Sequence, residues 1–370
     1  MKKEQINDKE AICIFTIFVI GSTLIVGIGG ELKSDRWVAG IIGILLAMPI
    51  TLIYARLQSI FQGQDIFDIL TVLFGKIGGR ILSLIYVWYA FHIGSLVIRN
   101  FGEFVNIVAL PETPMFVPML IIGLMAVFAV KLGIEVIGRT CAYILPILLT
   151  ILVTVQLLGI PAMKFHYIKP ILAVGIAPLL KGGFTSFSFP FAETVLFLGV
   201  FFTLQTKKSP YKVYFSGLIF AGIIIILSAI RNVLILGELG SSLYFPSHVA
   251  VGRIVVGEFI QRIEVSVAFV FAVASLIKSS IGLFVATKGL SKIFNLNDYR
   301  SIVIQTGLLM VFLAQILYKD IMSMTEWAMK VYPYYAFPFQ VILPIAIWIL
   351  AEIKKNKINV GAENAGQSKA

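Results

Sequence analysis

Residues 21–30 read Gly21-Ser22-Thr23-Leu24-Ile25-Val26-Gly27-Ile28-Gly29-Gly30 and form the second half of an apolar run that starts near residue 11. A second apolar run, at 183–204, contains Phe184-Thr185-Ser186-Phe187-Ser188-Phe189-Pro190-Phe191-Ala192-Glu193. Glycine weakens a helix and proline removes a backbone donor, so both stretches are expected to break their helices. Broken helices at corresponding positions of two halves indicate a transporter-like site near the membrane midplane. Glycines that only permit close helix packing are the alternative for the first stretch, and its proline-containing counterpart favours the broken-helix interpretation.

The whole chain has the composition of a membrane protein. Of its 370 residues, 59% are apolar and 13% are charged, and the mean hydropathy is +0.96. Soluble domains carry roughly 25% charged residues. Apolar runs of about 18–25 residues recur, which is long enough to cross the hydrocarbon core as helices. We therefore expect an all-α polytopic membrane protein with about ten spans, near 11–30, 37–55, 81–108, 114–131, 142–160, 183–204, 213–237, 262–286, 301–319 and 334–352.

The distribution of basic residues predicts the topology. Most Lys and Arg residues lie in six segments, which are the N-terminus, 56–80, 132–141, 205–212, 287–300 and the C-terminal tail. The positive-inside rule then places both termini in the cytoplasm, and it explains the net charge of +11 without a nucleic-acid partner. The spans form one transmembrane domain over 1–355, with five-span halves at about 11–160 and 183–352. The polar tail at 356–370 is expected to be disordered.

Charged side chains inside the expected spans are costly, so each needs an explanation. Arg99 and Glu103 are four residues apart on one helix face, where they either pair with each other or contact a polar ligand. Glu193 follows Pro190 and is expected near the positive end of a half-helix, where it either caps the break or holds a ligand ammonium. Lys278 lies mid-span, too far from a loop for easy snorkelling. It is expected to pair with Glu193 or Glu103, to replace a bound cation, or to act as a proton-linked switch.

The first break also offers backbone amides that suit a carboxylate, with Ser22, Thr23 and Gly27 as the nearest candidates. A zwitterionic amino acid would then be recognised at both ends, its carboxylate by these amides and its ammonium by a glutamate. Catalytic motifs such as a P-loop, G-x-S-x-G or H-E-x-x-H do not occur, the three histidines are scattered, and there is no CxxC. The sequence therefore predicts no enzyme, no metal site and no cofactor.

A series of short patterns runs along residues 5–355. They are Ile20-Gly21-Ser22, Arg99-x-x-x-Glu103, Glu112-Thr113-Pro114, Gly133-x-Glu135-x-x-x-Arg139, Lys169-Pro170 with Gly175 and Pro178, Phe189-Pro190-Phe191-Ala192-Glu193, Tyr244-Phe245-Pro246, Arg262-x-Glu264 and Gly289-Leu290. In order and spacing they resemble the bacterial spore-germination permeases. These are the B-type integral-membrane subunits of nutrient germinant receptors, within the amino acid–polyamine–organocation transporter superfamily. Ala192 stands where that family has glycine.

This resemblance implies two inverted five-helix repeats with helices 1 and 6 broken, and a site for an amino acid or another small nutrient. By position, the implied site residues are Gly21, Ser22, Gly27, Arg99, Glu103, Phe189, Pro190, Glu193, Ser275 and Lys278. The resemblance also implies A-type and C-type partner subunits in the inner membrane of the spore, where ligand binding triggers germination. We therefore expect a nutrient-sensing receptor subunit. A proton-coupled amino acid transporter and a channel or scaffold subunit remain as alternatives.

Overall fold

The computed structural model describes residues 4–29, 32–255 and 262–354, and within these ranges the chain forms helices and no strands. The α-helices are α1 (Asp8–Ile20), α2 (Thr23–Val26), α3 (Arg36–Ile60), α4 (Ile66–Val108), α5 (Phe116–Leu132), α6 (Ile134–Leu158), α7 (Ile176–Ser186), α8 (Ser209–Leu236), α9 (Pro246–Gly252), α10 (Glu264–Ile293), α11 (Val303–Ile316), α12 (Ile321–Lys330) and α13 (Tyr332–Phe337). The short 3-10 and π segments are η1 (Lys33–Asp35), η2 (Ile160–Ala162), η3 (Phe165–Ile168), η4 (Phe187–Phe191), η5 (Ala192–Gly199), η6 (Phe201–Thr203), η7 (Gly237–Ser242), η8 (Tyr299–Ile302) and η9 (Pro338–Ile342). The predicted tail at 356–370 lies outside the described residues.

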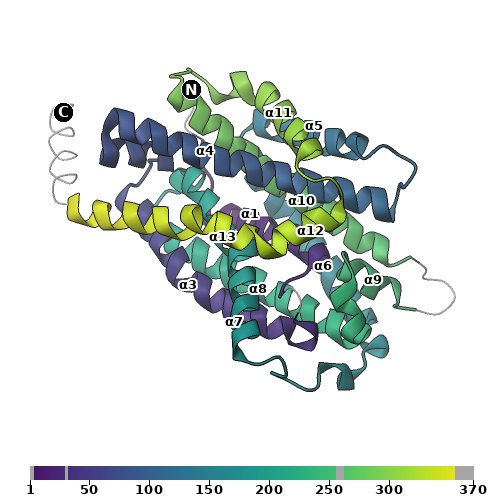
Figure 1. Cartoon of the computed structure of the whole chain (residues 1–370). Coiled ribbons are helices and arrows are strands. Elements are labelled where there is room, and N and C mark those ends of the chain that lie inside the picture. Colours follow the sequence, from purple (N-terminus) through teal and green to yellow (C-terminus); the bar gives the residue numbers. More distant parts are fainter. Residues whose placement is uncertain (1–3, 30–31, 256–261, 355–370) are drawn as a thin grey trace.

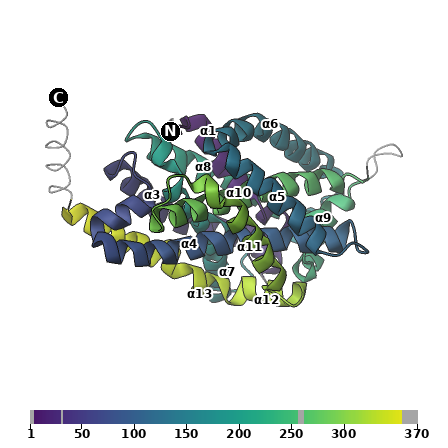
Figure 2. The ribbon, with the colours of Figure 1, turned by 90° about the horizontal axis from the view of Figure 1, so that it is seen from above.

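Within the described residues, eight helices are long and apolar enough to cross a membrane, namely Asp8–Val26, Lys33–Ile60, Ile66–Val108, Ile134–Leu158, Ser209–Ser242, Glu264–Ile293, Tyr299–Ile316 and Tyr332–Lys354. Two further apolar segments are α5, with 17 residues, and the interrupted run from α7 to η6. The expectation of an all-α polytopic protein with about ten spans is thereby confirmed. Figure 2 shows α10 in the middle of the bundle and α6 along its rim, in keeping with their largely buried and largely exposed side chains.

Both predicted helix breaks are present. The first helix ends at Ile20, its backbone departs from helical geometry at Gly21 (φ −18°, ψ −114°), and the short α2 stops at Gly27 with φ +82°. The second break begins where α7 runs into the π turn η4, in which Phe189 is extended (φ −129°, ψ 113°). A 3-10 helix, η5, continues from there. At both places the regular helical backbone is interrupted within a largely buried part of the chain.

Helix α4 begins at Ile66, well before the third span that is predicted at 81–108, so the helix is longer than the span. Asp65 caps this helix by accepting hydrogen bonds from the amides of Phe67 and Asp68, and Asp68 accepts one from the Asp65 amide in return. This reciprocal capping box stabilises a helix start that hydropathy alone does not reveal. The helix then kinks at Gly75, where φ is +73°, and the spanning part follows.

Replacing Gly75 by alanine should lower the melting temperature. The backbone of Gly75 (φ +73°, ψ −178°) lies in a region that only glycine enters without strain, at a cost of roughly 1–3 kcal/mol for other residues. Because no atom lies within 4 Å of the added Cβ, the effect should be conformational alone. Thermal unfolding in detergent checks this, with Ile77→Ala at an exposed position of the same segment as the control. An unchanged or higher melting temperature for Gly75→Ala would contradict this description of the kink.

The segments predicted to be cytoplasmic meet at one end of the bundle. Hydrogen bonds and ion pairs join them two by two: Arg300 to Glu4, the Gln5 amide to Glu135, Lys212 to Asp8, Gln62 to the Gln205 carbonyl, and Lys354 to the Leu73 carbonyl. The six segments therefore share one side of the protein, as a chain that crosses the membrane an even number of times requires.

Figure 1 shows the other element that matters here, α12, which links α11 to α13 across the front of the bundle.

Candidate functional site

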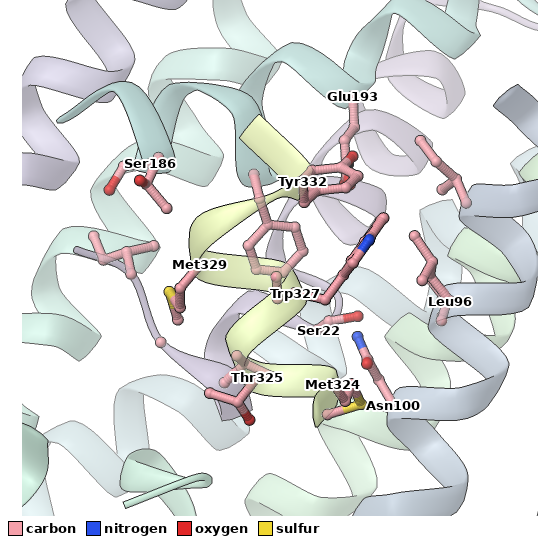
Figure 3. A pocket seen from close by; sticks show the side chains of 18 of the residues that line it. Ser22, Leu96, Asn100, Ser186, Glu193, Met324, Thr325, Trp327, Met329 and Tyr332 are labelled. Atoms are coloured by element: carbon pink, nitrogen blue, oxygen red, sulfur yellow. Dashed lines mark hydrogen bonds between the residues drawn. The ribbon is translucent and has the colours of Figure 1, made fainter. Parts of the chain in front are cut away.

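A cavity of about 60 Å³ lies between the two helix breaks. Its lining comes from the first break (Ser22, Val26, Gly27, Ile28, Gly29), α4 (Ile93, Leu96, Val97, Asn100), the second break (Thr185, Ser186, Phe189, Glu193), α10 (Lys278), and the segment around α12 (Tyr318, Met324, Thr325, Trp327, Ala328, Met329, Tyr332). Figure 3 shows the side chains of α12 projecting over the pocket, with Ser22 and Asn100 contributed by other elements. The site is therefore built from helices that are distant in sequence.

A buried ion pair joins the second helix break to α10 at this cavity. The Lys278 ammonium donates to the Glu193 carboxylate, and the Tyr332 hydroxyl donates to the other oxygen of Glu193. Lys278 is fully buried, and its Nζ also lies 5.0 Å and 4.9 Å from the ring centres of Phe18 and Phe189. Both charges are compensated, as their burial requires. The predicted pairing of Lys278 with Glu193 is thus present.

Gly21 makes room for this lysine. A Cβ at Gly21 would lie 3.1 Å from Cδ of Lys278 and 3.0 Å from the Phe18 carbonyl oxygen. A side chain at position 21 would therefore crowd the stem of Lys278. The role of Gly21 is steric, and it is not among the residues that line the cavity.

A chain of polar side chains extends from the ion pair and braces the second break. The hydroxyls of Tyr332 and Tyr89 are 3.4 Å apart, and Gln340 donates from Nε2 to the Tyr89 hydroxyl at 2.8 Å. Gln340 also donates to the Ser188 carbonyl at 2.9 Å, and its amide oxygen accepts from the Ser188 hydroxyl at 3.1 Å. Since Ser188 lies in η4, this network fixes the interrupted backbone beside Glu193.

Three serine hydroxyls near the breaks have no hydrogen-bond partner within the described residues: Ser22, Ser186 and Ser275. Each side chain is almost completely buried, and Ser22 and Ser186 line the cavity from opposite breaks. A buried hydroxyl without a partner costs roughly 1–3 kcal/mol. Such unsatisfied groups in a cavity are typical of a site that a polar ligand or water completes.

Of the predicted site residues, the structure gathers five around the cavity. Ser22, Gly27, Phe189, Glu193 and Lys278 line it. The remaining six, Gly21, Thr23, Arg99, Glu103, Pro190 and Ser275, do not. The Thr23 hydroxyl bonds back to the Val19 carbonyl, and Ser275 lies one helix turn before Lys278 on α10.

Arg99 and Glu103 form a separate structural pair. Arg99 donates from Nε and Nη2 to one Glu103 oxygen, at 3.0 and 2.8 Å, and from Nη1 to the carbonyls of Ala314 and Gln315 at the end of α11. Both side chains are buried. The guanidinium approaches the cavity only through the ring of Tyr318, whose centre lies 6.0 Å from its central carbon. Of the two interpretations, the geometry supports mutual pairing.

The sequence analysis missed α12, which covers the cavity. The segment 320–333 lies between the expected spans 301–319 and 334–352, and no element was predicted there. Two local signals point to the helix. Asp320 accepts hydrogen bonds from the amide and hydroxyl of Ser323, each at 2.8 Å, as an N-cap does, and Glu326 pairs with Lys330 one turn later. Trp327 on α12 and Tyr332 at the start of α13 were the cavity residues that the sequence pattern did not reveal.

A wider vestibule of about 420 Å³ adjoins the cavity on the other side of α12. The two spaces share five residues, which are Val26, Ile28, Met324, Thr325 and Met329. Arg36 and the Lys330–Glu326 ion pair also line the vestibule. Since α12 contributes Met324, Thr325 and Met329 to both spaces, a shift of this helix would enlarge the cavity toward the vestibule.

The N-cap of α12 should make this helix, which covers the cavity and is called the lid below, less stable in acid. Hydrogen bonds from Ser323 lower the pKa of the exposed Asp320 carboxylate. A lowered folded-state pKa means that the stabilisation is present above the unfolded pKa of about 3.9 and is lost as the pH falls through the folded value. Protection factors of the α12 amides in hydrogen exchange should consequently fall below about pH 4. The substitution Asp320→Asn supplies a capping side chain that does not titrate, so the pH dependence should disappear in that variant; its persistence would contradict the assignment to Asp320.

The sequence and the fold both have known relatives. A family model described as spore germination protein matches residues 5–322. Spore germination protein KB of Bacillus subtilis (strain 168) is 26% identical over 366 residues, which is 96% of this chain and 97% of that protein. Spore germination protein B2 of the same organism is 23% identical over 360 residues, covering 92% and 95%.

Solved transporter structures resemble the fold. The nucleobase-cation-symport-1 family transporter Mhp1, in a closed conformation with bromovinylhydantoin bound, aligns with a TM-score of 0.71 at 13% identity, covering 88% of this chain and 75% of that chain. MhsT in complex with L-phenylalanine aligns with a TM-score of 0.63 at 12% identity, covering 95% and 99%. The expected class of fold, a polytopic helical bundle with helices 1 and 6 broken as in inverted-repeat transporters, is confirmed by this likeness.

Proposed function

The chain belongs to the spore germination protein family, and on that premise we propose that it is the membrane-embedded nutrient-sensing subunit of a spore germinant receptor. The observation that carries the proposal is the small cavity between the two helix breaks. It contains the Lys278–Glu193 pair and the hydroxyls of Ser22 and Ser186, which have no hydrogen-bond partner among the described residues. This combination of apolar walls with a few convergent polar groups is typical of small-molecule sites.

The ligand we propose is an amino acid or another small nutrient. Ser22, Ser186 and Asn100 offer hydrogen bonds to its polar end, while Phe189 and Trp327 cover its apolar part. Lys278 and Glu193 provide opposite charges within one cavity, which suits the two ends of a zwitterion. Of the predicted set, we propose that Gly21, Thr23, Pro190 and Ser275 act through the residues that line the cavity and that Gly27 shapes the first break. Arg99 and Glu103, which were also predicted, are assigned to a structural pair that holds α4 to α11.

The size of the cavity suggests how binding is signalled. About 60 Å³ is far below the roughly 300–1,000 Å³ of an ordinary ligand pocket. A nutrient therefore fits only after α12 moves and the cavity merges with the vestibule. A ligand that binds this rearranged state more tightly than the closed one shifts the population toward it, and this differential affinity is the signal.

The family also suggests where and with what the subunit works. We propose that it lies in the inner membrane of the spore, with both termini cytoplasmic, and that it assembles with A-type and C-type receptor subunits. The five-span repeats are assigned to about 11–160 and 183–352 within a single domain over 1–355. Basic segments gathered at one end of the bundle support this orientation through the positive-inside rule.

A second candidate is a proton-coupled amino acid transporter. The fold likeness to transporters supports it, as does the buried Lys278–Glu193–Tyr332 chain, which holds groups that can exchange protons during a transport cycle. The two functions differ in one measurable respect, because a transporter accumulates its ligand behind a closed membrane and a sensor only binds it.

The test combines binding and uptake. The purified chain is reconstituted in lipid vesicles and screened with radiolabelled amino acids, with and without an imposed proton gradient. Saturable binding without accumulation supports the sensor. Accumulation driven by the gradient would instead establish the transporter, and conductance without any saturable ligand would point to a channel subunit.

A further inference from the structure

A separate pocket, of about 340 Å³, lies where α4 kinks at Gly75. Lys76, Arg80 and Ser83 of α4 line it, together with Lys292 near the end of α10 and Asn295 just beyond that helix. Every one of these side chains can donate a hydrogen bond, and three carry positive charge. None belongs to the candidate nutrient cavity.

The positive charge of this pocket is only partly compensated. Lys292 pairs with Asp65 at 2.5 Å and with Asp68 at 2.6 Å. Lys76 and Arg80 have no ion pair, hydrogen bond or ring contact in the part of the chain that the structure describes. They are four residues apart on one helix face, an arrangement in which like charges destabilise a helix. An anion placed between them removes this repulsion.

The position of the pocket indicates where such an anion comes from. The stretch 81–98 contains no Asp, Glu, Lys or Arg, and it is long enough to cross the hydrocarbon core. Arg80 immediately precedes this stretch, so it lies at the level of the lipid headgroups. Beside it, Ile77 and Ile81 are 79% and 58% exposed and offer an apolar surface to acyl chains. A donor-rich, cationic pocket next to an exposed apolar face matches the two parts of one phospholipid.

We propose that this pocket binds the phosphate headgroup of an anionic phospholipid and anchors the kinked start of α4 to the membrane. Arg80 presents its guanidinium fork to the phosphate oxygens, and Lys76 adds a point charge from the preceding turn. Ser83 and Asn295 complete the donor set from the two sides of the pocket. The uncompensated pair of cations thereby acquires its counter-charge from the bilayer.

The experiment measures how phosphatidylglycerol stabilises the full chain in nanodiscs of phosphatidylcholine. The melting temperature should rise with the mole fraction of phosphatidylglycerol and then saturate. Each basic side chain near an anionic surface contributes about five-fold in affinity, so Lys76→Gln/Arg80→Gln should raise the half-saturating mole fraction about 30-fold. The control Lys207→Gln/Lys208→Gln removes two exposed charges from the loop after η6, outside the pocket, and should leave it unchanged.

Two results would overturn the proposal. One is an equal shift in the two double variants, which would mean that any pair of surface charges has this effect. The other is full stabilisation by millimolar glycerol phosphate without phosphatidylglycerol, which would assign the pocket to a soluble anion. The single variant Lys76→Arg keeps both the charge and the Arg80 fork, so it should retain the lipid response.

Discussion

Lys278→Met should abolish saturable nutrient binding and lower the free energy of unfolding by about 3–5 kcal/mol, because Glu193 would keep its buried charge without the ammonium partner. Only the Tyr332 hydroxyl would remain as a donor to that carboxylate. Binding of radiolabelled nutrient and denaturation of the purified protein measure the two effects separately.

Two further variants separate the charge from the fold. Adding Glu193→Gln to Lys278→Met removes the orphaned charge, so most of the lost stability should return while binding remains absent. Lys288→Met removes another lysine of α10, one that lies over the Phe202 ring at 3.7 Å and outside the cavity, and it should leave binding intact. Unchanged affinity in Lys278→Met would show that the nutrient does not contact the ion pair.

Arg99→Met should also destabilise the protein by about 3–5 kcal/mol, but without removing the binding site. The substitution leaves Glu103 buried and uncompensated and releases the two carbonyls at the end of α11. Because neither Arg99 nor Glu103 lines the cavity, nutrient affinity of the folded protein should stay the same.

The double variant Arg99→Met/Glu103→Gln provides the folded protein for that comparison, since it removes both charges together. Its melting temperature should lie above that of Arg99→Met, and its binding isotherm should match the wild type. Loss of binding in the double variant, with the fold preserved, would place the Arg99–Glu103 pair in the ligand site after all.

The helix breaks and the central ion pair were predictable because each has a local cause. Gly21 and Pro190 interrupt helices through their own backbone chemistry, and the cost of burying Lys278 demands a carboxylate nearby. Few carboxylates occur within the expected spans, so Glu193 was one of two candidate partners. These features depend only on the type of residue and on its position within an expected span, and both can be read from the sequence.

The rest depends on contacts between residues far apart in the chain. The Arg99 guanidinium donates hydrogen bonds to carbonyls of α11 more than 200 positions away in the sequence, and no local pattern predicts this contact. The position of α12 over the cavity follows from how α11 and α13 are placed, although its Asp320 cap was readable. Tyr332 likewise acquires its role only when α12 ends beside Glu193. A sequence pattern therefore located the breaks but not the lid.

The central claim is that the nutrient occupies the cavity beneath α12, and cysteine protection tests it most directly. Both native cysteines are buried, so a single introduced thiol can be followed. Thr325 lines both the cavity and the vestibule, and Ser301 is exposed elsewhere. We expect a saturating nutrient to slow maleimide labelling of Thr325→Cys, with the same half-saturating concentration as in direct binding, and to leave the labelling of Ser301→Cys unchanged. Labelling of Thr325→Cys at the same rate with and without the bound nutrient would contradict it.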